Sequence, residues 1–377
     1  MHIALLAHSL QHNNIGRLFP VAQMLEQRSD LRVTIVGIDH GGARFPLLAD
    51  LHSPVIALPS GRGRRTSLEA AIQGHDVLHV FKNRPFLLEV LEAVAPTHQP
   101  VILDLDDWEL GAYLQGLPDV AWWRQLVPSR FLIARIQQWL ALDTASRQGP
   151  RAMTVNSTTL RALFGGELFY TPVDLTRFDP GKGDRHHARA RFGLALEDEV
   201  IGFLGTPHPY KGFDLLLTVY ARLKAARPRL RLLVTGVPAE NPYRERLSAL
   251  PGVILTGYLP LADYPAAYLA CDVLPLPQQP NLAAVVQTPL KLLLGMAMQR
   301  AMVVSAVGDM PAVVGDAGII LPADDPDQWA AALASLLDNA VWRAQIGGKA
   351  RARLLGTADY PTRRRQLLAL YARVLDR

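Results

Sequence analysis

Strand-length apolar runs alternate with amphipathic stretches along the whole chain, and this alternation constrains the fold more than any other feature. In the first half the apolar runs are residues 3–7, 33–36, 77–80, 101–105, 152–155 and 168–170. In the second half they are residues 200–204, 230–235, 253–255, 273–276, 302–305 and 319–321. Such alternation is typical of βαβ units, so we expect an α/β protein with two doubly wound parallel sheets.

Helical periodicity fills many of the intervals between these strands. It predicts helices at residues 18–27, 86–95, 131–142, 213–226, 325–337, 341–355 and 362–375. A chain of 377 residues suits two domains, and the turn-rich stretch 171–183 indicates the connection between them. The predicted parts are an N-terminal domain 1–172, a linker 173–184, a C-terminal domain 185–358, and a final helix in 359–377 that packs back toward the first domain.

Composition indicates a folded protein of the cytoplasm. The chain is 49% hydrophobic and 19% charged, which is globular rather than disordered. No apolar run reaches the roughly 20 residues of a membrane span, and residues 1–7 indicate a first strand rather than a signal peptide. The single cysteine, Cys271, excludes a disulfide framework.

The formal net charge of +5 suits an anionic ligand, an anionic membrane surface or nucleic acid. The basic residues are scattered and no nucleic-acid module is present, so we expect no nucleic-acid partner. The densest basic cluster is residues 62–65. It is interpreted either as a solvated loop or as a contact to phosphate or to lipid headgroups on the inner face of a membrane.

A phosphate-binding site is predicted where the helix of residues 288–298 begins. Thr288 would cap the helix, Pro289 would occupy its first position, and Lys291 would lie in the first turn after Leu290. Free amides, the positive end of the helix dipole and an ammonium together favour an anion. The alternative is an ordinary capped helix of the core.

A second loop of the same kind precedes the predicted helix 213–226. Gly205, Thr206, His208 and Lys211 lie in a run of glycine and turn prolines directly after a strand. Such a loop can bind an anion through its backbone and its lysine. One lysine at a helix start is usually a surface residue, but two such loops in one domain favour a shared ligand.

Carboxylates end the predicted strand 101–105. Asp104, Asp106 and Asp107 could hold a divalent metal, act on a substrate, or cap a helix and pair with arginines. The aromatic segment that follows, with Trp122 and Trp123, is either a lip facing sugar or lipid or a local core. The polar loop 8–17 opens a helix near Gly16 and lacks the glycine pattern of a dinucleotide site.

The second half resembles the donor domain of family 4 glycosyltransferases, which are retaining enzymes of the GT-B fold. The similar segments are residues 205–216, 230–236, 253–258, 268–277, 288–297 and 303–314. In the first half, residues 14–17 are similar to the family's acceptor loop, and Asp106 and Asp107 stand in the place of its His-Asp pair. The resemblance implies two Rossmann-like domains that face a central cleft, and transfer of a sugar from a nucleoside diphosphate.

The resemblance also assigns roles to residues. The diphosphate would be bound by Gly205, Thr206, His208, Lys211, Thr288, Pro289, Leu290 and Lys291. Gly236, Gly257 and Tyr258 would lie near the nucleobase and ribose, Gly16 and Arg17 near the phosphate or acceptor, and Asp106 and Asp107 at the reaction centre. No metal and no cofactor is implied, since the helix dipole and lysine neutralise the leaving diphosphate.

Four positions depart from the family pattern. Thr206 stands where the family has an arginine, Val286 and Leu294 replace its two glutamates, and Asp106 replaces its acceptor-side histidine. A leucine cannot accept a hydrogen bond from a ribose hydroxyl. These departures raise the alternative that the chain is a non-catalytic partner of an active glycosyltransferase.

We therefore expect a glycosyltransferase that uses a UDP- or GDP-sugar and a glycan, lipid or small-molecule acceptor. Two further alternatives stay open. One is a metal-dependent transferase with Asp104 and Asp106 as its metal ligands, and the other is a nucleotide-sugar epimerase.

Overall fold

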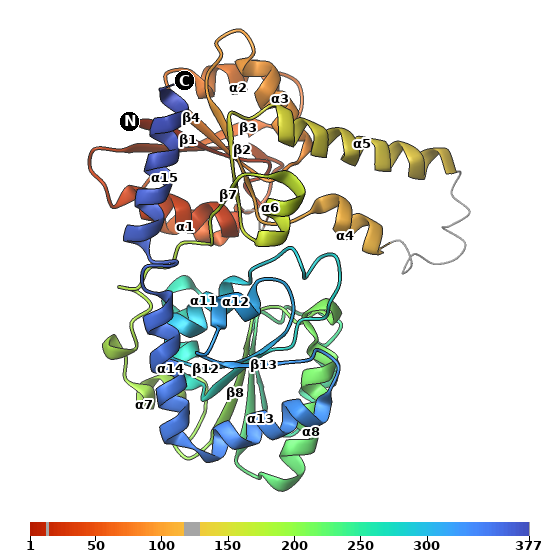
Figure 1. The fold of residues 1–377 in the computed structure, drawn as a ribbon, viewed down its shortest axis with the longest axis vertical. Coiled ribbons are helices and arrows are strands. Elements are labelled where there is room, and N and C mark those ends of the chain that lie inside the picture. Colours follow the sequence, from red (N-terminus) through yellow and green to blue (C-terminus); the bar gives the residue numbers. More distant parts are fainter. Residues whose placement is uncertain (13–14, 117–128, 377) are drawn as a thin grey trace. The chain divides into compact units, whose positions relative to one another are not determined.

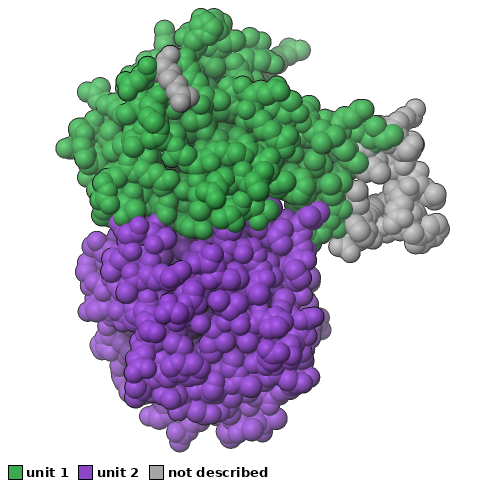
Figure 2. All heavy atoms as spheres, viewed as in Figure 1, with its two compact units in different colours: residues 1–172, 360–377 green, residues 173–359 purple. Residues whose placement is uncertain are grey.

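The computed structural model describes residues 1–12, 15–116 and 129–376 (Figure 1). Trp122, Trp123 and Asn14, which the sequence analysis singled out, lie outside the described residues. The chain divides into two compact units (Figure 2). Unit 1 consists of Met1–Pro172 and Tyr360–Arg377, and unit 2 is Val173–Asp359. The stretch 173–184 thus belongs to unit 2.

Unit 1 contains a seven-stranded parallel sheet. Its strands are β1 (His2–Ala7), β2 (Arg32–Asp39), β3 (Val55–Pro59), β4 (Val77–Phe81), β5 (Val101–Leu105), β6 (Ala152–Val155) and β7 (Glu167–Leu168). The spatial order is β3-β2-β1-β4-β5-β6-β7. The apolar runs at β1, β4 and β5 are buried along almost their whole length, as expected of strands covered on both faces.

Helices cover both faces of this sheet (Figure 1). They are α1 (Ile15–Glu26), α2 (Arg64–Ile72), α3 (Pro85–Val94), α4 (Glu109–Gly116), α5 (Ser129–Gln148), α6 (Thr158–Phe164) and α15 (Tyr360–Leu375). α15 packs beside α1, and α2 packs beside α3 on the opposite face. The basic cluster 62–65 is not a loop throughout, because Arg64 and Arg65 begin α2 and pair with Glu89 and Glu69.

Unit 2 contains a six-stranded parallel sheet. Its strands are β8 (Glu199–Leu204), β9 (Leu230–Thr235), β10 (Val253–Leu255), β11 (Val273–Leu276), β12 (Ala301–Ser305) and β13 (Ile319–Leu321), in the order β10-β9-β8-β11-β12-β13. Its helices are α7 (Arg185–Arg191), α8 (Phe213–Ala226), α9 (Arg244–Ser248), α10 (Tyr264–Ala270), α11 (Leu290–Ala297), α12 (Met310–Val314), α13 (Pro326–Asp338) and α14 (Ala340–Leu354). The predicted α/β class with two doubly wound sheets is confirmed.

In each unit the strand order reverses at one point. The reversal lies between β1 and β4 in unit 1 and between β8 and β11 in unit 2. In open α/β sheets, ligands bind outside the carboxyl ends of the strands at this point. The loops that follow β8, β11, β1 and β4 are therefore where a site is expected.

Unit 2 is entered and left through adjacent backbone. Val173 pairs with Asp359 as an isolated parallel bridge, and the Val173 amide donates to the Ala358 carbonyl at 2.8 Å. The two segments that connect unit 2 to the rest of the chain are thus hydrogen-bonded neighbours.

Candidate functional site

The loop after β8 is shaped by two glycines. Gly205 has a φ of 144° and Gly212 a φ of 68°, and both values fall in the region that favours glycine. A Cβ atom on Gly212 would lie 1.7 Å from the carbonyl oxygen of Pro277, so the loop after β11 approaches the backbone there. Between the glycines, the short 3₁₀ turn Pro209–Lys211 presents Lys211 at the start of α8.

Lys211 contacts the backbone of its own loop and the ring of Tyr210, 5.5 Å from its Nζ. Its ammonium donates to the Thr206 carbonyl at 2.8 Å. Burial lowers the pKa of Lys211 to about 8, and no carboxylate of the described residues offsets this shift. His208, on the same loop, is exposed, and its ring lies 4.5 Å from the ring of Tyr210. Partial burial of its ring and the charge of Lys211 lower the pKa of His208.

Lys291 brings a second lysine Nζ to the same place. Its Nζ is buried without a hydrogen-bond partner in the described structure and lies 4.0 Å from the centre of the Phe203 ring. A Cβ atom on Gly205 would be 3.4 Å from this Nζ. Burial, reinforced by the charge of Lys211, lowers the pKa of Lys291 well below its usual value. The two predicted anion-binding loops therefore meet.

The start of the helix that carries Lys291 differs from the prediction. α11 begins at Leu290, and Pro289 is its N-cap residue, without a side-chain cap. Thr288 is buried one position further out and is not the cap. The physical reason is that Pro289 is extended, with a ψ of 127°, so that the helical turn begins one residue later. Lys291 is then the second residue of the helix.

The predicted nucleobase residues lie beside these loops. The Gly236 amide donates to the Gly257 carbonyl at 2.9 Å, which joins the ends of β9 and β10. A Cβ atom on Gly236 would be 3.1 Å from the Thr206 amide nitrogen, so the loop after β8 is close as well. Tyr258 follows Gly257 and is 68% exposed. An exposed aromatic ring at this edge is available to a flat ligand.

Apolar side chains occupy the positions of the family's glutamates. Val286 is 1% exposed and Leu294 is 9% exposed. Both belong to the packed interior of unit 2, and neither offers an oxygen to a ligand.

In unit 1, the carboxylates after β5 surround Lys82. The Lys82 ammonium lies 3.2 Å from Asp106, contacts Asp107 and is 4.0 Å from Glu109. Lys82 follows β4 with a φ of 73°, an unusual conformation for a residue with a side chain. Burial is the largest cause of a rise in the pKa of Asp106 to about 6, which Lys82 opposes. The three acids raise the pKa of Lys82 above its usual value despite its burial.

Arg17 is engaged inside unit 1 and does not face an open loop. Its guanidinium binds both oxygens of Asp104 at 2.8 and 2.9 Å, the Phe169 carbonyl and the Thr171 hydroxyl at 2.7 Å each, and Asn156 at 3.5 Å. These bonds use all five N–H groups of an arginine. Gly16 lies within the first turn of α1. The predicted role of Arg17 at the phosphate or acceptor therefore has no free donor to support it.

Asp104 and Asp106, the metal ligands of the metal-dependent alternative, both pair with cationic side chains. Asp104 is fully buried and binds Arg17 and Thr154, whereas Asp106 pairs with Lys82. In the part of the chain that the structure describes, no group of three histidine, cysteine or acidic side chains is arranged to hold a metal ion.

Several functional candidates escaped the sequence analysis. Lys82, Arg84 and Glu109 join the two aspartates, and Arg84 pairs with Glu109 at 2.6 Å. His8 follows β1 at the reversal of strand order, and its Nδ1 is buried without a hydrogen-bond partner among the described residues. Burial and nearby cations lower the pKa of His8 to about 3. The position of Lys82 directly after a buried strand was the available signal.

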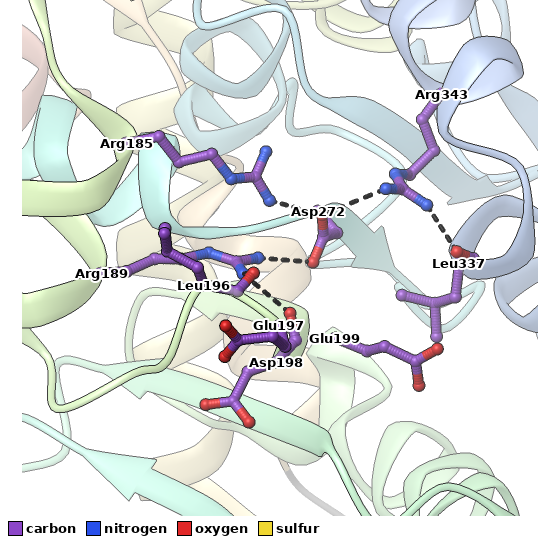
Figure 3. Close-up of a pocket in the computed structure, with 9 residues that line it drawn as sticks. All are labelled: Arg185, Arg189, Leu196, Glu197, Asp198, Glu199, Asp272, Leu337 and Arg343. Atoms are coloured by element: carbon purple, nitrogen blue, oxygen red, sulfur yellow. Dashed lines mark hydrogen bonds and ion pairs between the residues drawn. The ribbon is translucent and has the colours of Figure 1, made fainter.

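A charged pocket lies at the opposite edge of the unit 2 sheet (Figure 3). Asp272 precedes β11 and binds Arg185 at 2.5 Å and Arg189 at 2.8 Å, with Arg343 at 3.5 Å. It also accepts the Val200 amide at 2.8 Å. This carboxylate joins α7 and α14 to the sheet. Because it lies before a strand and not after one, the pocket is remote from Lys211 and Lys291.

Residues 198–339 match the protein family described as "Glycosyl transferases group 1". Unit 2 is therefore a group 1 glycosyltransferase domain, within a chain of the GT-B fold. The family resemblance seen in the sequence is confirmed.

Among curated proteins, the chain is similar to the D-inositol 3-phosphate glycosyltransferases of two bacteria. It is 31% identical to that of Segniliparus rotundus over 202 residues, or 50% of this chain and 43% of the relative. For Stackebrandtia nassauensis the identity is 33% over 208 residues, or 47% of this chain and 46% of the relative. In both cases the match spans less than half of the relative.

Solved structures agree over the whole chain. The structure of Anabaena Alr3699/HepE in complex with UDP-glucose superposes with a TM-score of 0.76 at 17% identity, covering 99% of each chain. Sucrose-phosphate synthase of Thermosynechococcus elongatus superposes with a TM-score of 0.72 at 18% identity, covering 100% of this chain and 99% of the other. At such identities the likeness establishes the fold. Within the described residues, no helix combines the length and the apolar character needed to cross a bilayer.

Proposed function

We propose that this protein transfers a sugar, with retention, from a nucleoside-diphosphate sugar to a hydroxyl group of an acceptor. The observation that carries the proposal is the pair Lys211 and Lys291. The two Nζ atoms lie at the strand-order reversal of unit 2, and no carboxylate of the described residues pairs with either of them. Buried cations without anions are costly unless a ligand supplies the opposite charge.

A diphosphate is the ligand that suits this arrangement. Its charge grows as the bond to the sugar breaks, and preorganised donors in a site shielded from water stabilise that charge. Lys211, Lys291 and the first amides of α11 would supply these donors without a metal ion. Gly236, Gly257 and the exposed Tyr258 would lie along the nucleoside. The Anabaena relative was solved with UDP-glucose, which makes UDP-sugars the first donors to test.

The acceptor would bind to unit 1 at the carboxyl ends of β1, β4 and β5. Asp106 and Asp107, held by Lys82, would orient a hydroxyl group there. The curated relatives are named for D-inositol 3-phosphate, so this compound belongs in an acceptor panel beside glycans and lipids.

The test is a hydrolysis and transfer assay of the purified protein with UDP-, GDP- and ADP-sugars. Wild type should consume one donor class. Lys211→Ala should lower turnover by about 10²–10³-fold, the usual effect of removing one donor to a developing anion. Lys349→Ala, which removes an exposed lysine that pairs with Asp316, is the matched control and should behave as wild type. Equal turnover by Lys211→Ala and wild type would refute the assignment.

One observation favours a second candidate, a non-catalytic partner of an active glycosyltransferase. Val286 and Leu294 are buried and apolar where the family has glutamates. A thermal-shift series with UDP, GDP and ADP separates the two, because a ligand that binds the folded state raises the melting temperature. Stabilisation by a nucleotide together with donor consumption supports the enzyme. The absence of both supports the non-catalytic partner.

A further inference from the structure

The environment of Lys291 is unusual for a charged side chain. Its Nζ is buried, has no hydrogen-bond partner in the described structure and rests 4.0 Å from the Phe203 ring centre. A ring face attracts a cation, but it does not replace the hydrogen bonds that an ammonium makes with water. A neutral amine is far less costly to bury than an ammonium.

The charged surroundings of Lys291 favour its neutral form over the ammonium. Of the described charged side chains, Lys211 alone acts on it through its charge, and this charge is positive. His208 lies on the same loop as Lys211 and contributes no negative charge. β8 contributes Phe203 and no ionisable side chain at this point, and Lys291 is the one ionisable residue of α11. Lys211 differs from Lys291 because it donates to the Thr206 carbonyl.

We propose that Lys291 is an unprotonated amine in the free protein and takes up one proton when a nucleoside diphosphate binds. The inference rests on the proposed function, since it takes the ligand of the two lysines to be that diphosphate. The lone pair of Nζ forms the new N–H bond with a proton from the solvent, and no bond of the nucleotide breaks. The second positive charge of the site therefore exists only in the complex.

Two consequences follow from this coupling. Affinity for a nucleoside diphosphate falls as pH rises, by up to about tenfold per pH unit between the pKa of Lys291 in the free protein and its higher pKa in the complex. The residue also makes the site selective, because a nucleoside without phosphates provides no charge to hold the proton. The lowered pKa of Lys291 agrees with this behaviour but is not its basis.

The test is isothermal titration calorimetry of the whole protein with UDP, and with GDP in parallel. Each titration is repeated near pH 7 in buffers that differ in ionisation enthalpy, and the dependence of the heat on the buffer gives the number of protons taken up. Because the terminal phosphate has a second pKa of about 6, its own protonation changes little at this pH. Uridine serves as the nucleoside without phosphates and should cause no uptake.

Matched variants assign the proton to one residue. Wild type should take up nearly one proton, and Lys211→Arg and His208→Gln should retain the uptake. Lys291→Arg should bind with no uptake, because a guanidinium is always protonated. Lys291→Met, a variant of similar shape, should also lose the uptake and should bind the nucleotide more weakly.

The outcomes separate the inference from the proposed function. UDP or GDP binding without proton uptake overturns the inference and leaves the proposed function intact. Uptake that persists in Lys291→Arg but disappears in Lys211→Arg or His208→Gln assigns the proton to another residue and also overturns it. If neither UDP, GDP nor ADP binds to wild type, both the inference and the proposed function are wrong.

Discussion

At the scale of single residues, the site of unit 2 depends on the glycine at position 212, where there is no room for a side chain. Gly212 has a positive φ and lies against the Pro277 carbonyl, so the loop that carries Lys211 and the loop after β11 touch through backbone. No other residue type can adopt this conformation at this separation.

Gly212→Ala should therefore destabilise the protein and weaken nucleotide binding. The left-handed conformation and the overlap with Pro277 together should cost about 2–4 kcal/mol. Gly193→Ala is the matched control: Gly193 also has a positive φ, at 65°, but a Cβ atom there would meet nothing within 4 Å. Urea denaturation of the two variants isolates the effect of the overlap. Equal midpoints would show that the two loops separate freely.

Sequence reasoning found some of these residues and missed others for a physical reason. Lys211 and Lys291 are recognisable because a helix start and a preceding loop are local patterns. The contacts of Arg17 could not be predicted because its partner, Asp104, is 87 residues away, and only the folded sheet brings the two together. Lys82 was missed because its importance comes from Asp106 and Asp107, which follow the neighbouring strand β5.

At the scale of elements, buried polar bonds fix the position of α1 in unit 1. Arg17 on α1 binds Asp104 on β5, Thr171 and the carbonyl of Phe169, and both charged side chains are almost wholly buried. Helix and sheet are thus joined by a charged pair in addition to apolar packing.

Arg17→Met should lower the free energy of unfolding by about 3–5 kcal/mol, since it leaves the Asp104 carboxylate buried without its counter-charge. Adding Asp104→Leu to this variant should recover part of the loss, because the unpaired charge is then removed. Arg28→Met, which removes an exposed arginine paired with Asp30, is the control and should cause no measurable change. Denaturant titration of the four proteins provides the comparison. An Arg17→Met variant as stable as wild type would contradict the structural role of the pair.

Most elements were predicted from periodicity, and those that were missed have weak patterns. The bounds predicted at β5, β6, β9, β10, β11, β13 and α8 coincide with those observed. Two of the elements that were missed illustrate this: β3 lies at the sheet edge, with mostly exposed or half-buried residues, and α2 carries a basic first turn that resembles a loop. The start of α11 was predicted one residue early, because a proline can occupy either the cap or the first turn.

At the scale of the whole chain, acid should affect unit 1 through buried histidines. His79 on β4 is fully buried, its Nδ1 lies 2.7 Å from the hydroxyl of Tyr371 on α15, and burial lowers its pKa to about 4. The unfolded chain has a histidine pKa of about 6.5. Below this value the unfolded state binds a proton that the folded state does not.

Stability contributed by neutral His79 is therefore complete above about pH 6.5 and is lost as pH falls toward 4, by up to about 3 kcal/mol. His79→Gln, which can keep a hydrogen bond to Tyr371, should show a smaller loss over this window. Denaturant midpoints at neutral and at mildly acid pH measure the difference. His8, whose pKa is also lowered, should leave part of the acid sensitivity in place. Parallel profiles for variant and wild type would exclude His79 as a source.

The bridge between Val173 and Asp359 brings together the two points at which the chain enters and leaves unit 2. Because both ends of unit 2 meet as paired backbone, unit 2 is an insertion in the sequence of unit 1, which resumes at α15. An inserted domain of this kind can be deleted or exchanged as one segment, since a short loop can join the two ends of unit 1 that remain. Under the proposed function, chimaeras that exchange residues 173–359 between relatives should change the choice of nucleotide-sugar and leave unit 1 unaltered.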